Sequence, residues 1–151
     1  MKENHIIVDS VDERMISFIK KHHTLTLATS CNNVPWCCSC FYVYDKKENK
    51  FIITSDFETR HVSEFIKQQR VAGAIALETL VIGRIQGIQF SGLINEVKEN
   101  EIEHYRKIYI KRFPVAAFSE LKLWSIEPDL IKFTHNLFGI GKKLIWERKK
   151  V

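Results

Sequence analysis

Residues 51–75 read FIITSDFETRHVSEFIKQQRVAGAI and hold the strand-helix-strand pattern on which the fold depends. Phe51–Ser55 are mostly β-branched or aromatic, which predicts a short strand. Apolar side chains at Val62, Phe65 and Ile66 then follow at helical spacing and predict one amphipathic helix. Val71–Leu77 return to an apolar run that is too short for a helix, so we expect a buried strand there.

The residues before this stretch predict one helix and a β-hairpin. Ser10 and Glu13 have the spacing of a capping box, which predicts a helix over Val11–His22. Alternating patterns then predict strands over Thr24–Thr29 and Trp36–Tyr44, joined by a Cys-Asn-Asn-Val-Pro turn.

The residues after this stretch add strands and one further helix. Alternation is clearest over Ile85–Val97, and helical spacing covers Glu99–Phe113 before Pro114 limits the helix. Three more strands are predicted over Leu121–Ile126, Leu130–Thr134 and Lys143–Trp146, with a turn at Glu127-Pro128-Asp129 between the first two.

Strands linked by hairpins, with short helices between them, predict an α+β protein built on an antiparallel barrel rather than a parallel sheet. The chain has no repeat, linker or low-complexity stretch at which it could be divided. We therefore expect a single domain over 1–151, with an N-terminal helix within 1–23 and a basic tail over 142–151.

Composition and charge exclude several classes of protein. The 151 residues are 45% hydrophobic and 27% charged, as in a folded domain rather than a disordered chain. The net charge is +5, but Lys142–Lys150 hold five basic residues and one acidic residue, which leaves about +1 elsewhere. No aromatic platform or reading helix accompanies this tail, so nucleic-acid binding is not expected.

The N-terminus and the cysteines predict a cytoplasmic protein. The sequence begins MKENHIIVDSVDER, which has no apolar core of a signal peptide, and no apolar run approaches the roughly 20 residues of a membrane-spanning helix. The four cysteines would then lie in a reducing compartment, where disulfides are not expected.

Residues 51–75 resemble the central segment of the pyridoxamine 5'-phosphate oxidase-like FMN-binding split barrels. In those proteins a strand ends in a hydroxyl residue, a loop carries Ser or Thr followed by basic residues, and a helix leads to the next strand. The segments IQGIQFSGLI, YIKRFPVA, LWSIEPDLIKFTHN and FGIGKKLIW are similar to the YhbP-type bacterial branch, whose function is uncharacterised. The likeness runs from about Leu25 to Trp146.

The resemblance implies a six-stranded antiparallel split barrel that forms a homodimer and holds flavin mononucleotide (FMN) at the subunit interface. It places Cys37–Phe41 along the flavin ring, Thr54 and Ser55 at the ribityl and phosphate groups, and Thr59–His61 at the phosphate. The implied FMN-binding residues are Cys38, Ser39, Cys40, Phe41, Thr54, Ser55, Thr59, Arg60, His61, Gln86, Gln89 and Trp124.

Elementary chemistry supports the phosphate assignment independently. A guanidinium, hydroxyl groups and the free N–H groups of a helix N-terminus all favour a dianion, and Thr59–His61 bring these groups to one turn. The better-known oxidases carry an arginine and a lysine on the strand that matches Cys37–Tyr42, whereas this chain has cysteines and aromatic residues there. We therefore see no second phosphate site for pyridoxamine phosphate as substrate.

Several residues keep alternative interpretations. Cys38 and Cys40 share one face of a strand and Cys37 the other, so the three cannot easily surround one metal ion, and plain burial is favoured. The resemblance implies that a glutamine of the partner chain reaches FMN, and Gln86 and Gln89 are competitors for that position. The alternative is that both are solvent-facing strand residues.

The leading hypothesis is an FMN-binding protein that acts as an oxidoreductase on an unknown small molecule. The cofactor would supply the redox chemistry, and no pair of residues marks a catalytic acid and base. The alternative is a non-catalytic barrel that binds a flavin or haem, with His61 or His135 as the iron ligand.

Overall fold

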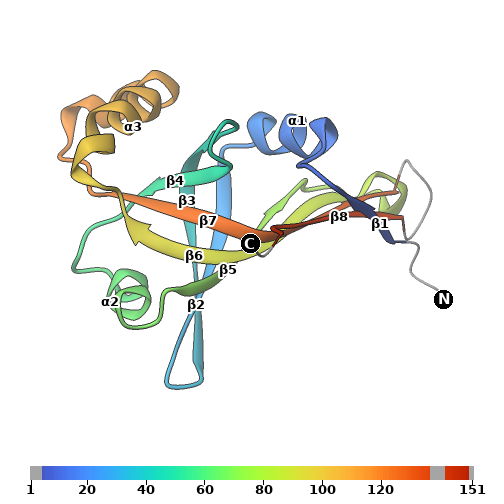
Figure 1. Ribbon diagram of the computed structural model, residues 1–151, viewed down its shortest axis with the longest axis horizontal. Coiled ribbons are helices and arrows are strands. Elements are labelled where there is room, and N and C mark those ends of the chain that lie inside the picture. The colour runs from blue at the N-terminus through green and yellow to red at the C-terminus, as the bar shows by residue number, and fades with distance from the viewer. Residues whose placement is uncertain (1–4, 137–141, 150–151) are drawn as a thin grey trace.

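The computed structural model describes residues 5–136 and 142–149 (Figure 1). The helices are α1 (Glu13–Lys21), α2 (Arg60–Lys67) and α3 (Glu99–Arg112), with 3-10 turns η1 (Ile82–Arg84) and η2 (Pro114–Phe118). The strands are β1 (His5–Val8), β2 (Thr24–Cys31), β3 (Val34–Asp45), β4 (Lys50–Thr54), β5 (Arg70–Ala76), β6 (Gln86–Glu96), β7 (Leu123–His135) and β8 (Lys143–Glu147). Among the described residues, no helix is long and apolar enough to cross a membrane.

Six strands close into a barrel, which confirms the predicted fold class. They pair in the order β7-β4-β3-β2-β5-β6, and β6 pairs back with β7 to complete the ring. Every pair in this ring is antiparallel. Local patterns therefore predicted the strands of this ring, with β7 divided in two, and the hairpin connections predicted an antiparallel sheet.

Two further strands extend the sheet beyond the barrel. The basic segment near the C-terminus forms β8, which pairs with Leu130–Thr134 of β7. Strand β1 was not predicted, and it lies parallel to β8, as Figure 1 shows at the end of the molecule away from α3. Local patterns missed β1 because it is four residues long, leaves Ile6 and Ile7 exposed, and depends on a partner at the other end of the sequence.

The prediction of two separate strands around Glu127-Pro128-Asp129 was wrong, because β7 runs through this segment without a break. Its register against β6 shifts between Ser91 and Gly92, so the proline sits at a bulge, where a missing N–H is tolerated. Gly92 makes the close approach possible, since a Cβ there would lie 2.3 Å from the carbonyl oxygen of Glu127.

Helix α1 begins later than predicted because Asp12, not Ser10, is its N-cap. The Asp12 carboxylate accepts a hydrogen bond from the backbone N–H of Arg14 at 2.9 Å and another from the Arg14 side chain. This arrangement supplies the acceptor that a capping box would have supplied.

The two faces of β3 serve two different cores, and this division positions the candidate site. Tyr42 and Tyr44 point into the barrel core, whereas Val43 packs outside the barrel in a smaller cluster with residues of α3. Because strand side chains alternate, Cys38 and Cys40 share the inner face and Ser39 and Phe41 share the outer face.

Candidate functional site

Strand β3 has an open edge. Strand β2 pairs with all of Val34–Phe41, but β4 pairs with β3 only over Tyr42–Asp45. Within the described chain, no strand lies along the other side of Trp36–Phe41. The backbone N–H and C=O groups on that side can therefore bind the polar edge of a ligand.

Beside this edge, three polar side chains form a hydrogen-bonded cluster. Ser55 Oγ lies 2.5 Å from His61 Nε2 and 3.3 Å from Thr59 Oγ1, and Thr59 Oγ1 lies 3.2 Å from His61 Nε2. Thr59 Oγ1 also donates to the Asp56 carbonyl at 2.8 Å. The structure thus brings together three of the residues predicted for the phosphate site.

The position of Ser55 is set by the neighbouring strand β7. Its carbonyl accepts a hydrogen bond from Trp124 Nε1 at 2.8 Å, and its N–H donates to the Lys122 carbonyl at 3.1 Å. Trp124 is buried, with Phe57 and Phe65 packed edge-on against its ring. Trp124 was predicted to contact the ligand, and in the structure its hydrogen bond holds Ser55 in position.

The cluster lies at the N-terminus of α2. Thr59 is the N-cap, but its side chain makes no capping hydrogen bond to the helix. The N–H groups of the first turn and the helix dipole therefore favour an anion at this point. Burial lowers the pKa of His61, and the charge of Glu64 offsets this only in part. The ring is thus neutral near pH 7, with one donor and one acceptor nitrogen.

Arg60 lies next to the cluster in sequence but contacts other groups. Its Nε donates to Glu64 Oε1 at 2.8 Å, and its guanidinium stacks on the Trp36 ring, 4.1 Å from the ring centroid. Thr29 Oγ1 donates to the other oxygen of Glu64 at 2.5 Å. Arg60 is therefore held towards the β2-β3 hairpin, and about half of its side chain is exposed.

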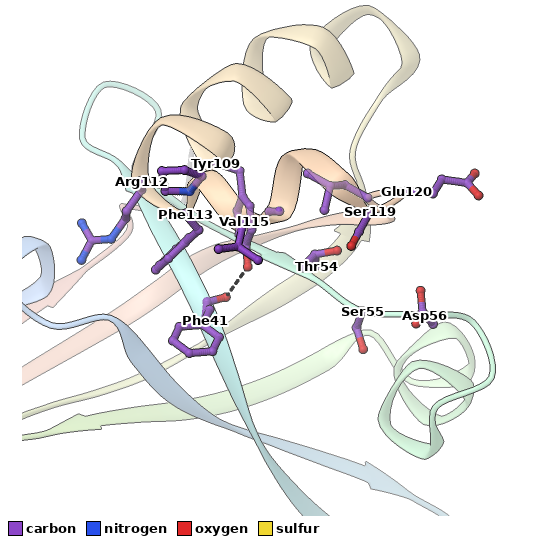
Figure 2. Close-up of a pocket in the computed structure, with 13 residues that line it drawn as sticks. Phe41, Thr54, Ser55, Asp56, Tyr109, Arg112, Phe113, Val115, Ser119 and Glu120 are labelled. Carbon is purple, nitrogen blue, oxygen red and sulfur yellow. Dashed lines mark hydrogen bonds between the residues drawn. The ribbon is translucent and has the colours of Figure 1, made fainter.

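A cavity of about 570 Å³ opens on the outer side of the β3 edge. Figure 2 shows Phe41, Thr54 and Ser55 on one side of it and the end of α3 on the other. This volume lies in the usual range for a small-molecule site. The lining residues are Phe41, Thr54, Ser55, Asp56, Tyr109, Arg112, Phe113, Pro114, Val115, Ala116, Ser119, Glu120 and Leu121.

The α3 and η2 side of this cavity was not predicted. Tyr109 donates to the Phe41 carbonyl at 3.4 Å, and burial raises its pKa to about 12, so the group stays a phenol. Arg112 donates to the backbone carbonyls of Lys20 and His22, which ties α3 to the end of α1. The segment YIKRFPVA was a possible signal, because it carries aromatic, basic and proline residues where a helix ends.

Two predicted residues, Gln86 and Gln89, lie elsewhere on the chain. Gln86 lines a separate depression of about 380 Å³ beside α1, together with His135. Gln89 is exposed and lies between Ala74 and Lys132 in the sheet. Within one chain, neither glutamine is brought to the Ser55 cluster.

Comparisons with known proteins agree with the fold. No family model matches the sequence. The UPF0306 protein of Cronobacter sakazakii (strain ATCC BAA-894) is 39% identical over 141 residues, which cover 93% of this chain and 97% of the relative. The UPF0306 protein YhbP of Escherichia coli O157:H7 is 37% identical over 131 residues, which cover 87% of this chain and 89% of the relative.

Three solved structures share the fold at low sequence identity. A heme binding protein from Mycobacterium smegmatis has a TM-score of 0.73 at 13% identity, over 93% of this chain and 60% of that chain. A FAD binding protein from the same organism has a TM-score of 0.64 at 13% identity, over 84% and 97%. A candidate pyridoxamine 5'-phosphate oxidase from Listeria innocua has a TM-score of 0.65 at 13% identity, over 82% and 97%.

The closed ring of six strands and these structural neighbours define a protein with the split-barrel fold. The solved structures establish only the fold, because their sequences are so different. The chain belongs to the UPF0306 family, since relatives of that family are 37–39% identical to it along most of their length.

Proposed function

We propose that the protein binds FMN with its phosphate at the Ser55–Thr59–His61 cluster and its ring along the open edge of β3. The hydrogen-bonded cluster at the uncapped start of α2 is the observation on which this proposal depends. The open edge and the adjoining cavity of about 570 Å³ offer the backbone groups and the apolar walls that a flavin ring needs.

In this proposal each part of the chain has a separate role. Ser55 donates a hydroxyl hydrogen bond to the phosphate, and Thr59 does so when its hydroxyl turns away from the Asp56 carbonyl. The free N–H groups of the α2 first turn add to them. Arg60 supplies positive charge from the helix start, and Phe41 and Thr54 contact the rest of the ligand. Bound FMN would supply hydride and electron transfer for an oxidoreductase that acts on a small molecule.

A homodimer in a reducing, cytoplasmic environment is part of the same proposal. Phe41 and Val115 line the cavity yet are 56% and 81% exposed, so a second subunit would cover apolar surface beside the ligand. All four cysteines are free thiols, which suits a reducing compartment. A glutamine from the partner subunit, Gln86 or Gln89 of this sequence, would then complete the site.

Paired titrations with FMN and riboflavin test the phosphate assignment, because riboflavin lacks only the phosphate. A hydrogen bond to a charged group is worth about 1.5–3 kcal/mol, so we expect FMN to bind at least about 10-fold more tightly than riboflavin. Ser55→Ala and Arg60→Ala should weaken the binding of FMN and leave that of riboflavin unchanged. Quenching of flavin fluorescence measures both affinities.

Matched substitutions on the same helix serve as controls. Ser63→Ala and Lys67→Ala change an exposed hydroxyl and an exposed cation of α2 away from the cluster, so both should bind FMN like wild type. Equal affinities of the wild type for FMN and riboflavin would overturn the phosphate site. An unchanged affinity of Arg60→Ala for FMN would show that Arg60 is not part of that site.

Haem is the second candidate ligand, because a structural neighbour is a heme binding protein. His61 beside the cavity and His135 beside the smaller depression are the possible iron ligands. Titration with haemin separates the two readings: a Soret band that is lost in His61→Ala or His135→Ala, without flavin binding, would favour haem.

A further inference from the structure

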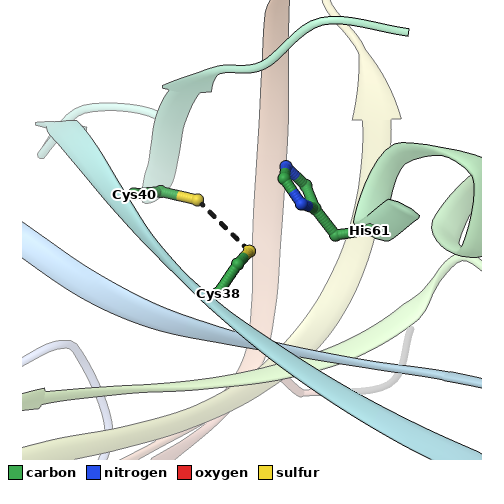
Figure 3. Close-up of side chains that lie close together, drawn as sticks. All are labelled: Cys38, Cys40 and His61. Atoms are coloured by element: carbon green, nitrogen blue, oxygen red, sulfur yellow. Dashed lines mark hydrogen bonds between the residues drawn. The ribbon is translucent and has the colours of Figure 1, made fainter. Parts of the chain in front are cut away.

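We propose that Cys38, Cys40 and His61 form a binding site for a thiolate-preferring metal ion, with Zn²⁺ as the expected occupant. The two cysteines lie two residues apart on the inner face of β3, and His61 comes from the first turn of α2. Their sulfur atoms are 3.7 Å apart, and the three ligand atoms all lie within 4.8 Å of one another. Figure 3 shows both thiols and the imidazole pointing into the same space.

The separation of the sulfur atoms fits tetrahedral coordination. With Zn–S bonds of about 2.3 Å at a tetrahedral angle, two sulfur ligands of one zinc ion lie about 3.8 Å apart. A sulfur and an imidazole nitrogen on the same ion lie about 3.5 Å apart, so the ring needs to move by little more than about 1 Å. The cysteine pair is thus already spaced for the ion.

The hydrogen bonds of His61 fit the role of a ligand. Its Nε2 lies 2.5 Å from Ser55 Oγ, which leaves Nδ1 as the ligand atom. Histidines that bind metals usually hold their second nitrogen in such a hydrogen bond, which fixes the ring. Ser55 is itself held at the end of β4 by Trp124, so the orientation of the ring is set by two elements.

Burial and charge also suit a divalent ion. Cys40 is buried, whereas Cys38 and His61 are only partly buried, so a solvent molecule can take a fourth position, as in open zinc sites. Two thiolates neutralise the charge of the ion. Cys40 lies in the barrel core and Cys38 is partly buried against it, so both thiols lie at the edge of the core, close to His61.

A disulfide between the two cysteines is the competing use of this pair. Residues two apart on a strand have Cα atoms roughly 6.8 Å apart, at the upper limit for a disulfide. The extended backbone of β3 therefore favours two separate thiols, which remain available as ligands.

Metal titration of the reduced, chelator-stripped protein tests the site. We expect one Zn²⁺ per chain in competition with a chromophoric chelator, and Co²⁺ should give thiolate-to-metal charge-transfer bands with the d–d spectrum of a tetrahedral site. Cys38→Ser should lose stoichiometric binding, and Ser55→Ala should weaken it about 10-fold. Cys37→Ser and Cys31→Ser are the matched controls and should bind like wild type.

The outcomes are separable from folding and from flavin binding. Cys38 is only partly buried, so Cys38→Ser should melt like stripped wild type, whereas Cys40→Ser removes a thiol from the core. No binding by wild type, or equal binding by Cys38→Ser, would overturn the proposal. The metal site is tested separately from the proposed function. Zn²⁺ is titrated in the absence of FMN, and FMN is titrated in the presence of a chelator, so either proposal can fail without the other.

Discussion

Glu64 links the start of α2 to the β2-β3 hairpin through a single carboxylate. It is 8% exposed, accepts from Thr29 and Arg60, and through Arg60 is joined to the stack on Trp36. Two hydrogen bonds hold the pKa of Glu64 below its ordinary value of 4.5. The bond from Thr29 has the larger effect, and the bond from Arg60 has the smaller one. Thr29, Glu64 and Trp36 thus position α2 without a proposed role in ligand binding, whereas Arg60 takes part in both.

Thr29→Val should lower the free energy of unfolding by about 1–2 kcal/mol at neutral pH, because a buried carboxylate oxygen loses its donor. Since the pKa of Glu64 is lowered in the folded state, the stability from this bond is present above the ordinary pKa and is lost as pH falls through the folded-state pKa. The difference between wild type and variant should therefore shrink in acid. Urea unfolding at pH 7 and below the ordinary pKa measures this.

Thr26→Val is the control for this experiment, since Thr26 lies on the same strand but is exposed. The charged form of Glu64 would not be the cause of the lost stability if wild type and Thr29→Val differed in unfolding free energy by the same amount at all pH values. An equal loss of stability in Thr26→Val would also contradict it.

At the scale of elements, the bulge between β6 and β7 lets the long strand β7 pair with both β4 and β8. The Leu123–Ile126 half of β7 pairs with β4 inside the barrel, and the Leu130–Thr134 half pairs with β8. Pairing of β6 with β7 shifts at Ser91 and Gly92, which lets both halves stay joined to β6. Closure of the barrel therefore depends on close backbone contact at Gly92.

Gly92→Ala should destabilise the protein by about 1–3 kcal/mol or more, because the new Cβ would overlap backbone atoms of β7 that cannot move aside. The nearest of these, the Glu127 oxygen, would lie 2.3 Å away. Thermal and urea unfolding measure the loss. Gly83→Ala is the control, since a Cβ there meets nothing within 4 Å, and it should change stability by less than about 1 kcal/mol. Equal stability of the two variants would contradict this account of the bulge.

At the scale of the whole molecule, apolar side chains gather beside the larger cavity. Val115 and Phe118 of η2 are 81% and 91% exposed, and Phe41 across the cavity is 56% exposed. The cavity opens between the barrel wall and α3 (Figure 2). Large apolar residues left in solvent beside a ligand-sized cavity are typical of surfaces that a partner covers.

Val115→Glu should shift the proposed homodimer towards monomer and weaken FMN binding together, because a buried charge at the interface is costly. Sedimentation velocity over a range of concentrations and flavin titration measure the two effects. Ile102→Glu, on α3 but outside the cavity lining, is the control and should leave both unchanged. A monomeric wild type, or a dimeric Val115→Glu with full FMN affinity, would contradict the homodimer.

The sequence by itself determined most of the elements and the class of the fold, although it missed β1 and divided β7 in two. The alternation along Ile85–Val97 and the helical spacing after Glu99 each depend on which side of an element is buried, and burial leaves a local pattern. The same logic separated Cys37 from Cys38 and Cys40. Resemblance added the turn at Thr59–His61, where the structure joins Ser55, Thr59 and His61 through hydrogen bonds.

Only the tertiary structure decided which distant segments meet. It paired β1 with β8, brought His61 to Cys38 and Cys40, turned Arg60 towards Glu64, and built the far cavity wall from α3. Periodicity specifies the face that a residue occupies but carries no information about the partner that covers it. Those contacts depend on how the barrel closes and on which strand ends the helices pack against. Both are properties of the whole chain.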